Sequence, residues 1–382
     1  MASVRRERAY LDYNATAPLR PEARAAMTAA FDLGGNPSSI HAEGRAARAI
    51  VEDARRAVAE LAGVGPRGIV FTSGGTEAVN LALTPAGKAV RLIASAGEHV
   101  CVLAGHRFAP EAATLAPLRP DGRIDLAALE AALDAGGPAL LALQGANNET
   151  GVLQPVAEAA ALAHARGGIV VCDAVQLAGR TSLDAQALGA DYLVLSAHKF
   201  GGPKGAGALI AARPELHVGS PLLRGGGQER GSRAGTENVA GIAGFGSAAR
   251  AVRGEVAAEA IRLAQLRDRL EARILAAAPD AVVFGAGAPR LPNTTCFAVP
   301  AIAAATLLMR LDLAGVAASS GSACSSGKVA RSHVLTAMGI APELAAGAIR
   351  LSLGWASREL DIELFIEAFA PAVASLRRRG AA

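Results

Sequence analysis

The chain contains 382 residues with a formal net charge of +4; 51% of the residues are hydrophobic and only 3% are aromatic. This length can build one large core or two domains, and Ala, Val, Leu and Ile must fill the interior in place of aromatic rings. The small and dispersed charge excess, the absence of an apolar run long enough for a bilayer and the lack of a secretory signal predict a cytoplasmic protein with no nucleic-acid or membrane partner.

Helical and strand patterns alternate through the first two thirds of the chain. Helical spacing covers residues 43–63 and 155–168, and apolar strands that end in polar residues are predicted within residues 68–75, 138–151, 168–176 and 191–199. Continuous apolar strands that alternate with helices are typical of a mostly parallel sheet covered by helices. The sequence therefore predicts an α/β fold, with a large domain over residues 15–254.

The pattern changes near residue 255. A long helix is predicted over residues 255–278, and shorter strands and helices follow, including residues 294–300, 301–315, 315–321 and 349–354 and a closing helix. We assign residues 255–382, together with residues 1–14, to a smaller α+β domain. No internal repeat is found.

Four polar clusters follow predicted strands, at residues 72–77, 145–151, 172–176 and 196–199. Ligands of open parallel sheets bind outside the carboxyl ends of the strands, so one shared site is the simplest explanation of the four clusters. The alternative is four unrelated polar loops. Gly74, Gly75 and Thr76 stand between a strand and a helix, where backbone N–H groups can bind a phosphate, although a plain turn has nearly the same pattern.

Lysine is rare in this chain. Only four of the 38 basic residues are lysines: Lys88, Lys199, Lys204 and Lys328. Arg stays protonated, whereas Lys can lose its proton and form an imine, so a Lys retained at a strand end indicates a chemical role. A surface lysine is the alternative, and we favour it for Lys88 and Lys204.

Lys199 comes 26 residues after Asp173, and each residue follows an apolar strand. A carboxylate in that position could pair with a protonated pyridine nitrogen, Gln176 could reach a ring hydroxyl, and Ser196 and His198 could hold a phosphate. The set fits one pyridoxal phosphate site with Lys199 as the imine-forming amine. A helix cap at Asp173 and a surface turn around Lys199 are the alternatives.

Three further residues are weaker candidates. His99 follows a strand and could stack on a cofactor ring, although a single His is more often structural. Thr236 lies at a helix start in residues 224–239, which contain five glycines and three arginines and could bind an anion, contact another subunit or form a surface loop. Arg350 lies on a predicted strand, where it could form an internal salt bridge or bind a substrate carboxylate.

The four cysteines, Cys101, Cys172, Cys296 and Cys324, show no CxxC or Cys/His spacing. We therefore expect neither a metal site nor a disulfide framework. Cys324 differs from the others because it lies in SSGSACSSG, where small residues give the chain little to bury and leave it free to move. An ordinary Gly/Ser loop with an incidental cysteine is the alternative.

Eight stretches together resemble the cysteine desulfurases of the class-V aminotransferase group: YLDYNATAP, GNPSSIHAEGRAAR, FTSGGTEAVNLAL, ANNETG, CDAVQ, SAHKFGGPKGAGAL, GGGQERGSRAGTENVAGI and ASSGSACSSG. The resemblance runs from about Tyr10 to Arg358 and is closest to the branch that serves nitrogen fixation and housekeeping iron–sulfur assembly. It implies a fold type I pyridoxal phosphate-dependent transferase. It also implies a homodimer that takes sulfur from L-cysteine and passes it, as a persulfide, to an acceptor protein such as an iron–sulfur scaffold.

The resemblance also implies a role for each candidate residue. Lys199 would carry the cofactor as an imine, Asp173 would pair with its pyridine nitrogen, Gln176 would contact its ring oxygen, and His99 would stack on the ring. Phosphate contacts would come from the group Gly75, Thr76, Ser196 and His198, and from Thr236 of the other subunit. Asn148 and Arg350 would hold the substrate carboxylate, and Cys324 would be the nucleophile, with Lys199 and His99 beside it in catalysis.

The chain departs from the family pattern in three places. PAIAAATLL (residues 300–308) stands where related proteins often have an acidic turn, GKVARSHVL (residues 327–335) replaces a more acidic stretch, and the chain stops at Ala382, where housekeeping members carry a scaffold-docking extension. The sulfur acceptor therefore stays open between an iron–sulfur scaffold, a tRNA-thiolation protein and another carrier. The alternative activities are a selenocysteine lyase or another class-V aminotransferase and, outside enzymes, a noncatalytic sulfur carrier or scaffold.

Overall fold

The computed structural model describes residues 7–85, 90–213, 216, 220–321 and 331–380. Its main feature is a seven-stranded sheet in the order β2 (Ile69–Thr72), β8 (Gly207–Ala211), β7 (Tyr192–Ser196), β6 (Ile169–Asp173), β5 (Ala139–Gln144), β3 (Arg91–Ser95) and β4 (Ala113–Ala116). Strand β8 runs antiparallel to both of its neighbours, and the other pairs are parallel. The predicted α/β fold with a mostly parallel sheet is confirmed.

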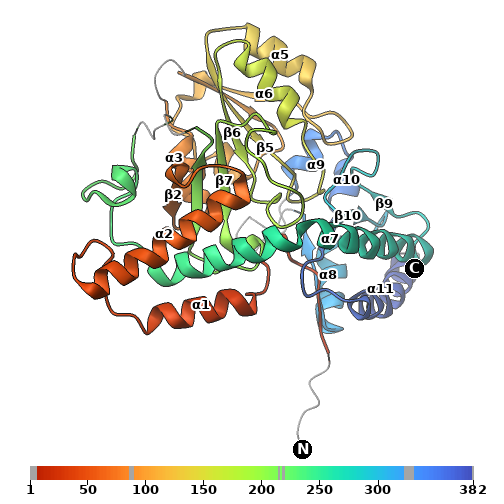
Figure 1. Cartoon of the computed structure of the whole chain (residues 1–382). Helices are drawn as coiled ribbons and strands as arrows, with labels where there is room; N and C mark the ends of the chain where they lie inside the picture. Colours follow the sequence, from red (N-terminus) through yellow and green to blue (C-terminus); the bar gives the residue numbers. More distant parts are fainter. Residues whose placement is uncertain (1–6, 86–89, 214–215, 217–219, 322–330, 381–382) are drawn as a thin grey trace, which may run out of the picture.

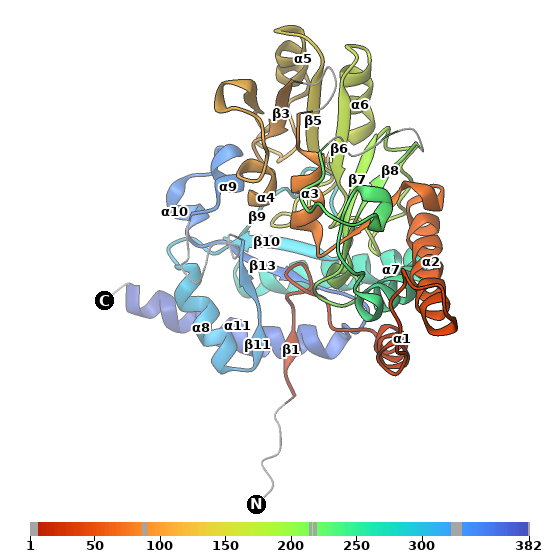
Figure 2. The ribbon, with the colours of Figure 1, turned by 90° about the vertical axis from the view of Figure 1, so that its left-hand side faces the viewer.

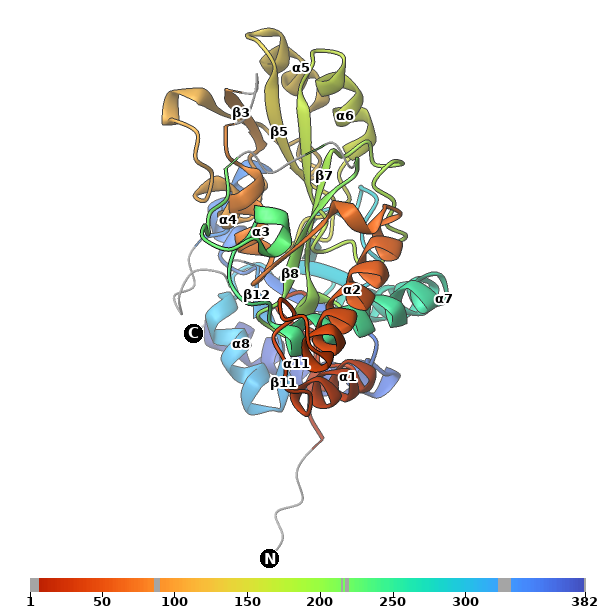
Figure 3. The same ribbon diagram turned by 60° about the vertical axis from the view of Figure 1, so that its left-hand side comes forward.

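Both faces of this sheet are buried, which explains the continuous apolar runs of its strands. Side chains alternate along a strand, so Leu141 and Leu143 of β5 belong to one core and Leu140 belongs to another. The first core includes residues of α2 (Ala42–Ala62), α5 (Leu126–Asp134) and α6 (Val156–His164), and the second includes residues of α3 (Gly75–Ala82) and α4 (Val100–Leu103). Figure 3 shows α3 and α4 across the sheet from α2.

A second, antiparallel sheet has the order β12 (Ser319–Ser320), β13 (Ile349–Ser352), β10 (Thr294–Ala298) and β9 (Val282–Val283). It shares a core with α8 (Ala304–Leu313) and α11 (Glu359–Gly380), in which Phe365 stacks on Phe369. Strand β1 (Ala9–Tyr10) returns the start of the chain to this region by pairing with β11 (Val316–Ala317). Figure 2 shows β10 and β13 between the large sheet and the pair α8 and α11.

Helix α7 (Val239–Ala277) connects the two regions without a break (Figure 1). The separate helix that we predicted from residue 255 is wrong, because residues 239–277 form one 39-residue helix. Phe245 lies in the large core and Leu270 lies in the small one, so the apolar stripe of the helix serves both. The proposed division between residues 254 and 255 falls inside α7 and stays a proposal.

The remaining elements are short or peripheral. They are α1 (Pro21–Phe31), α9 (His333–Ala337), α10 (Pro342–Ala345) and the 3-10 turns Pro66–Gly68, Pro110–Ala112, Ala197–Lys199 and Gln228–Gly231. Among the residues that the structure describes, no helix has both the length and the apolar character needed to cross a bilayer.

Candidate active site

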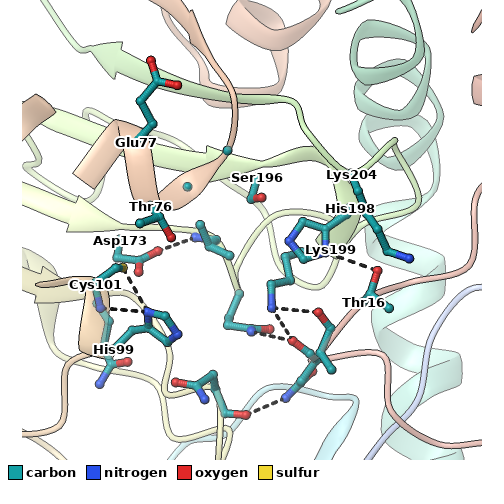
Figure 4. A pocket seen from close by; sticks show the side chains of 18 of the residues that line it. Thr16, Thr76, Glu77, His99, Cys101, Asp173, Ser196, His198, Lys199 and Lys204 are labelled. Carbon is teal, nitrogen blue, oxygen red and sulfur yellow. Dashed lines mark hydrogen bonds between the residues drawn. The ribbon is translucent and has the colours of Figure 1, made fainter. Parts of the chain in front are cut away.

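A cavity of about 610 Å³ lies where the large sheet meets the small one (Figure 4). The four polar clusters predicted to follow strands all contribute to its wall, together with Ala15, Thr16 and Arg350. Ten candidate residues line it: Gly75, Thr76, His99, Asn148, Asp173, Gln176, Ser196, His198, Lys199 and Arg350. Residues separated by up to 275 positions in the chain therefore share one surface, as the single-site hypothesis requires.

Lys199 ends the short turn that follows β7, and its amine reaches across to the N-terminal segment. Its Nζ donates hydrogen bonds to the backbone carbonyl oxygens of Asn14, at 2.7 Å, and Ala15, at 3.0 Å. A second lysine, Lys204, also lines the cavity. The cavity thus contains an amine of the type that forms imines, close to a wall of polar groups.

Asp173 is the last residue of β6, and one of its carboxylate oxygens already accepts a hydrogen bond. Its Oδ1 accepts a hydrogen bond of 3.0 Å from the backbone N–H of Val175. Burial raises the pKa of the Asp173 carboxyl, while this hydrogen bond and the charges of His99 and Lys199 oppose the rise. A cationic ring nitrogen in the cavity would offset the cost of burying this carboxylate.

The hydrogen bonding of the Gln176 side chain bears on whether the cavity binds a ligand. Its side-chain amide nitrogen donates to the backbone oxygen of Asn14 at 3.1 Å, but its Oε1 is buried and has no partner among the described residues. An unpaired buried oxygen is costly, and a donor on a ligand would satisfy it. A substituted pyridine ring with a hydroxyl group fits this requirement.

His99 precedes α4, and its ring is oriented by contacts with Cys101, two residues further along the chain. Its Nδ1 accepts a hydrogen bond of 3.2 Å from the backbone N–H of Cys101 and lies 2.9 Å from Cys101 Sγ. Because Nδ1 is an acceptor, the proton of the neutral ring lies on Nε2. Burial lowers the pKa of His99; Asp173 opposes that change, and Lys199 and His333 add to it. The ring is therefore held in its neutral form, with Nε2 as a donor.

Four of the residues predicted to bind phosphate, Gly75, Thr76, Ser196 and His198, lie at the start of α3 and after β7 and line the same cavity. A Cβ added to Gly75 would come within 3.2 Å of Val175 and 3.4 Å of Ser196, so a larger residue here would require these side chains to shift by a few tenths of an ångström. His198 Nδ1 is 3.2 Å from Thr16 Oγ1. Burial, with further help from the charges of Lys199, Lys204 and Arg180, lowers the pKa of His198 to about 4.

Arg350 occupies the opposite wall, on β13, and is only 2% exposed. Its Nη2 donates to Asp12 Oδ1 at 2.8 Å and its Nη1 donates to the backbone oxygen of Asn148 at 3.0 Å. Its Nε is buried and has no partner among the described residues. The internal salt bridge that the sequence left open is therefore present, and one donor remains for an anionic ligand.

Comparison with known proteins identifies the family. Residues 9–365 match the class-V aminotransferase family. A cysteine desulfurase of Cereibacter sphaeroides is 45% identical over 97% of both chains, and an IscS-like cysteine desulfurase of Mycobacterium tuberculosis is 39% identical over 97% of both. The X-ray structure of a NifS-like protein from Rickettsia africae superimposes with a TM-score of 0.88 at 34% identity, over 96% of this chain and all of the other.

The chain belongs to the cysteine desulfurases of the class-V aminotransferase family. The resemblance found from the sequence is thereby confirmed. The fold type expected for this family also agrees with the described structure, in which a mostly parallel sheet carries the cavity at the strand ends.

Two residues with expected roles in a cysteine desulfurase remain, Thr236 and Cys324. Thr236 lines an adjoining cavity of about 260 Å³, which shares Ser73 and Gly205 with the 610 Å³ cavity, and it is not among the residues that line the larger cavity within one chain. Its predicted contact with a second subunit stays a prediction. Cys324 lies outside the described residues.

Several residues at the site were missed by sequence reasoning. Asp12 and Thr16 belong to YLDYNATAP, a stretch used only for the family resemblance, and each pairs with a predicted site residue. Cys101 contacts His99, and no feature of the sequence distinguished it from the other apolar-context cysteines. Among the described residues, no group of three or more His, Cys, Asp or Glu side chains could hold a metal ion.

Proposed function

We propose that this cysteine desulfurase binds pyridoxal phosphate in the 610 Å³ cavity and uses it to move sulfur from L-cysteine to Cys324. One observation carries the proposal: an amine, a partly buried carboxylate and an unsatisfied amide oxygen, at Lys199, Asp173 and Gln176, line the same cavity as the guanidinium of Arg350. A noncatalytic sulfur carrier has no use for such a set.

The residues divide by the part of the cofactor they would hold. Lys199 would bind its aldehyde carbon, Asp173 its pyridine nitrogen and Gln176 its ring hydroxyl, and His99 would lie against the ring. The group Gly75, Thr76, Ser196 and His198 would bind the phosphate, with Thr236 of a second subunit added in a homodimer. When bound, pyridoxal phosphate withdraws electrons from the carbon atoms of the amino acid attached to it.

The remaining residues act on the substrate. Arg350 Nε and the Asn148 side chain would bind the carboxylate of L-cysteine, which fixes the substrate's α-carbon next to the Lys199 amine. That amine would take the α-proton and later return a proton to carbon. His99, with its proton on Nε2, would donate a hydrogen bond toward the substrate side of the ring.

The sulfur step is balanced without an external oxidant. The Cys324 thiolate attacks the sulfur of L-cysteine, the substrate C–S bond breaks, and an S–S bond forms on Cys324. The β-carbon left behind gains a proton, so L-cysteine and the Cys324 thiol become L-alanine and the Cys324 persulfide. A dithiol such as dithiothreitol then reduces the persulfide and releases sulfide.

The test compares Cys324→Ala with Cys101→Ala and Cys296→Ala. After incubation of the wild type with L-cysteine, mass spectrometry should find added sulfur on the peptide that holds Cys324. Cys324→Ala should lose nearly all sulfide release in dithiothreitol, while its visible absorption still responds to L-cysteine. Full activity in Cys324→Ala, or added sulfur only on another cysteine, would overturn the proposal.

The same assay separates the other activities. A class-V aminotransferase would form a keto acid instead of L-alanine, and a selenocysteine lyase would act on selenocysteine but leave L-cysteine unchanged. The physiological acceptor, an iron–sulfur scaffold or another persulfide-accepting protein in the cytoplasm, would be identified by the protein that gains the sulfur label from Cys324.

A further inference from the structure

A buried arginine, Arg180, contacts two of the residues proposed to hold the cofactor. It follows CDAVQ by four residues, is 4% exposed and does not line the 610 Å³ cavity itself. Its Nη1 donates to the backbone oxygen of Gln176 at 3.0 Å, and its Nη2 donates to the backbone oxygens of Lys199, at 3.3 Å, and Tyr13, at 3.4 Å. One guanidinium therefore joins three segments that are distant along the chain.

Gln176 and Lys199 lie beyond the strands that connect their segments. The ladder between β6 and β7 ends at the pair Asp173 and Val194. Gln176 comes three residues after Asp173, and Lys199 comes five residues after Val194, so the ladder does not fix their backbones directly. Arg180 supplies a connection there, because a planar guanidinium donates in fixed directions to both carbonyl oxygens.

The N-terminal segment depends on the same connection when the cofactor is bound. In the structure, Lys199 Nζ donates to the backbone oxygens of Asn14 and Ala15, and the Gln176 side chain also donates to Asn14. An imine nitrogen has at most one hydrogen, so Lys199 Nζ could not keep both of its hydrogen bonds once it carried the cofactor. The contacts of Arg180 use none of the atoms proposed to bind the cofactor, so they can persist.

The charge of Arg180 also affects this part of the site. Burial and the charge of Arg350 lower the pKa of Arg180 to about 9, so it stays largely protonated at neutral pH. Its charge, with those of Lys199 and Lys204, adds to burial in lowering the pKa of His198. A buried charge is costly unless its hydrogen bonds are made, and those of Arg180 go to the backbone of the site.

We propose that Arg180 is a positioning residue that fixes the backbones of Gln176 and Lys199 relative to each other and to the N-terminal segment, so that both side chains meet one cofactor. The inference rests on the cofactor roles proposed above for Gln176 and Lys199. Without Arg180 the two side chains would remain in the cavity, but their spacing would vary. A displacement of 1 Å at a reacting group can lower a rate about 100-fold, so attachment of the cofactor to Lys199 should slow.

The experiment adds pyridoxal phosphate to the cofactor-free wild type, Arg180→Gln and Arg180→Lys. Attachment to Lys199 is followed by visible absorption and by borohydride reduction with peptide mapping. Arg180→Gln should attach the cofactor at least about 10-fold more slowly and raise its dissociation constant at least about 10-fold. Arg180→Lys keeps the charge but lacks the planar arrangement of donors, so its attachment rate should fall between those of the wild type and Arg180→Gln.

Arg91→Gln is the matched control. Arg91 also donates to three backbone oxygens, those of Ala132, Leu133 and Gly137, but it begins β3 and so lies at the end of that strand away from the cavity. Loss of these hydrogen bonds should lower the unfolding midpoint, as in Arg180→Gln, while the rate of cofactor attachment stays at the wild-type value.

A second readout reports the charge. In an NMR titration of the cofactor-free chain, with the His198 signal assigned by its loss in His198→Asn, Arg180→Gln should raise the pKa of His198. Removal of one positive charge favours protonation of the ring. Arg180→Lys should leave this pKa near the wild-type value. An unchanged pKa in Arg180→Gln would contradict the placement of the charge beside this part of the site.

Contrary outcomes are distinct. If Arg180→Gln attaches the cofactor as fast as the wild type, or if Arg91→Gln slows attachment equally, Arg180 is only a structural residue. If Arg180→Lys attaches the cofactor as fast as the wild type, the planar contacts do not position the site, and this variant decides the matter if Arg180→Gln does not fold. Failure of the proposed function has another signature, because borohydride would then leave no cofactor on Lys199 of the wild type.

Discussion

The two walls of the cavity are built in different ways. On the large-sheet side, each functional residue lies at or just after the end of its own strand, as Asp173 does on β6 and Lys199 does after β7. On the small-sheet side, Arg350 lies within β13. Its hydrogen-bond partners are Asp12 and Asn148, which are 338 and 202 residues away along the chain.

This difference fits the separate tasks proposed for the two walls. The large-sheet wall positions its residues at the ends of buried strands of one sheet, packed on both faces. This arrangement suits the proposed cofactor, which would have to stay bound through every turnover. The small-sheet wall holds Arg350 through hydrogen bonds to distant segments, which suits its proposed role in binding the substrate carboxylate. Variants of the first wall should therefore affect cofactor binding, and variants of the second should spare it.

The largest effect is expected from Lys199→Ala. This variant lacks the amine that would form the imine and transfer the proton. We expect sulfide release to fall by about 100- to 10,000-fold and the cofactor to be bound less tightly. Borohydride reduction followed by peptide mapping should find the cofactor on Lys199 in wild type. Lys204→Ala, which changes the other lysine of the cavity, is the control and should keep the covalent cofactor. A reduced adduct on Lys88, Lys204 or Lys328 would contradict the assignment.

The thermodynamic link between the two regions can be tested in α7. Phe245 and Leu270 are both fully buried, one in each core, so Phe245→Ala should cost about 3–5 kcal/mol and Leu270→Ala about 2–5 kcal/mol of unfolding free energy. Since α7 is continuous, both should lower the midpoint of the same urea transition. Leu275→Ala changes an exposed leucine of the same helix and should cost less than about 0.5 kcal/mol. Two transitions, each sensitive to one variant, would show that the regions unfold separately.

Arg350→Ala tests the small-sheet wall. Removing a buried charged donor should weaken substrate binding by about 2–5 kcal/mol, seen as a raised KM for L-cysteine, while the visible spectrum of the bound cofactor is kept. Arg290→Ala breaks another paired arginine of the small-sheet region, the partner of Glu271, and should leave KM unchanged. If KM stays the same in Arg350→Ala and only stability falls, Arg350 is purely structural.

The smallest effect concerns His198 on the large-sheet wall. Because its folded-state pKa of about 4 lies below the ordinary value of 6.5, the cofactor-free folded chain binds fewer protons than the unfolded chain between these values. The free energy of unfolding should therefore fall as the pH drops from 6.5 toward 4. His198→Asn should flatten this slope by at most about 1 kcal/mol, since the ring is partly exposed to solvent.

The sequence predicted the large-sheet wall better than the small-sheet wall. Apolar runs that end in TSGGTE, CDAVQ and SAHK placed Asp173, Gln176 and Lys199 at one edge, because parallel strands bring their carboxyl ends together. The long helix was predicted as two pieces, one starting near Thr236 and one from residue 255, since the Gly- and Ala-rich residues 239–254 carry too few bulky side chains to show that the pattern is continuous. Arg350 was identified as a candidate, but the sequence could not show whether it forms an internal salt bridge or binds a substrate carboxylate. That Asp12 lies beside Arg350 is visible only in the structure.

By itself, the sequence determined the family and the α/β architecture and predicted Lys199 as the imine-forming lysine, because these depend on local motifs and on the order of apolar and polar residues along the chain. Only the tertiary structure decided which buried groups lack a partner, at Gln176 and Arg350, and which residues meet across long separations. Ser332 and Glu149 are 183 residues apart, and no local pattern specifies their contact. Their meeting depends on how the small sheet packs against the large one, so it emerges only when both cores have formed.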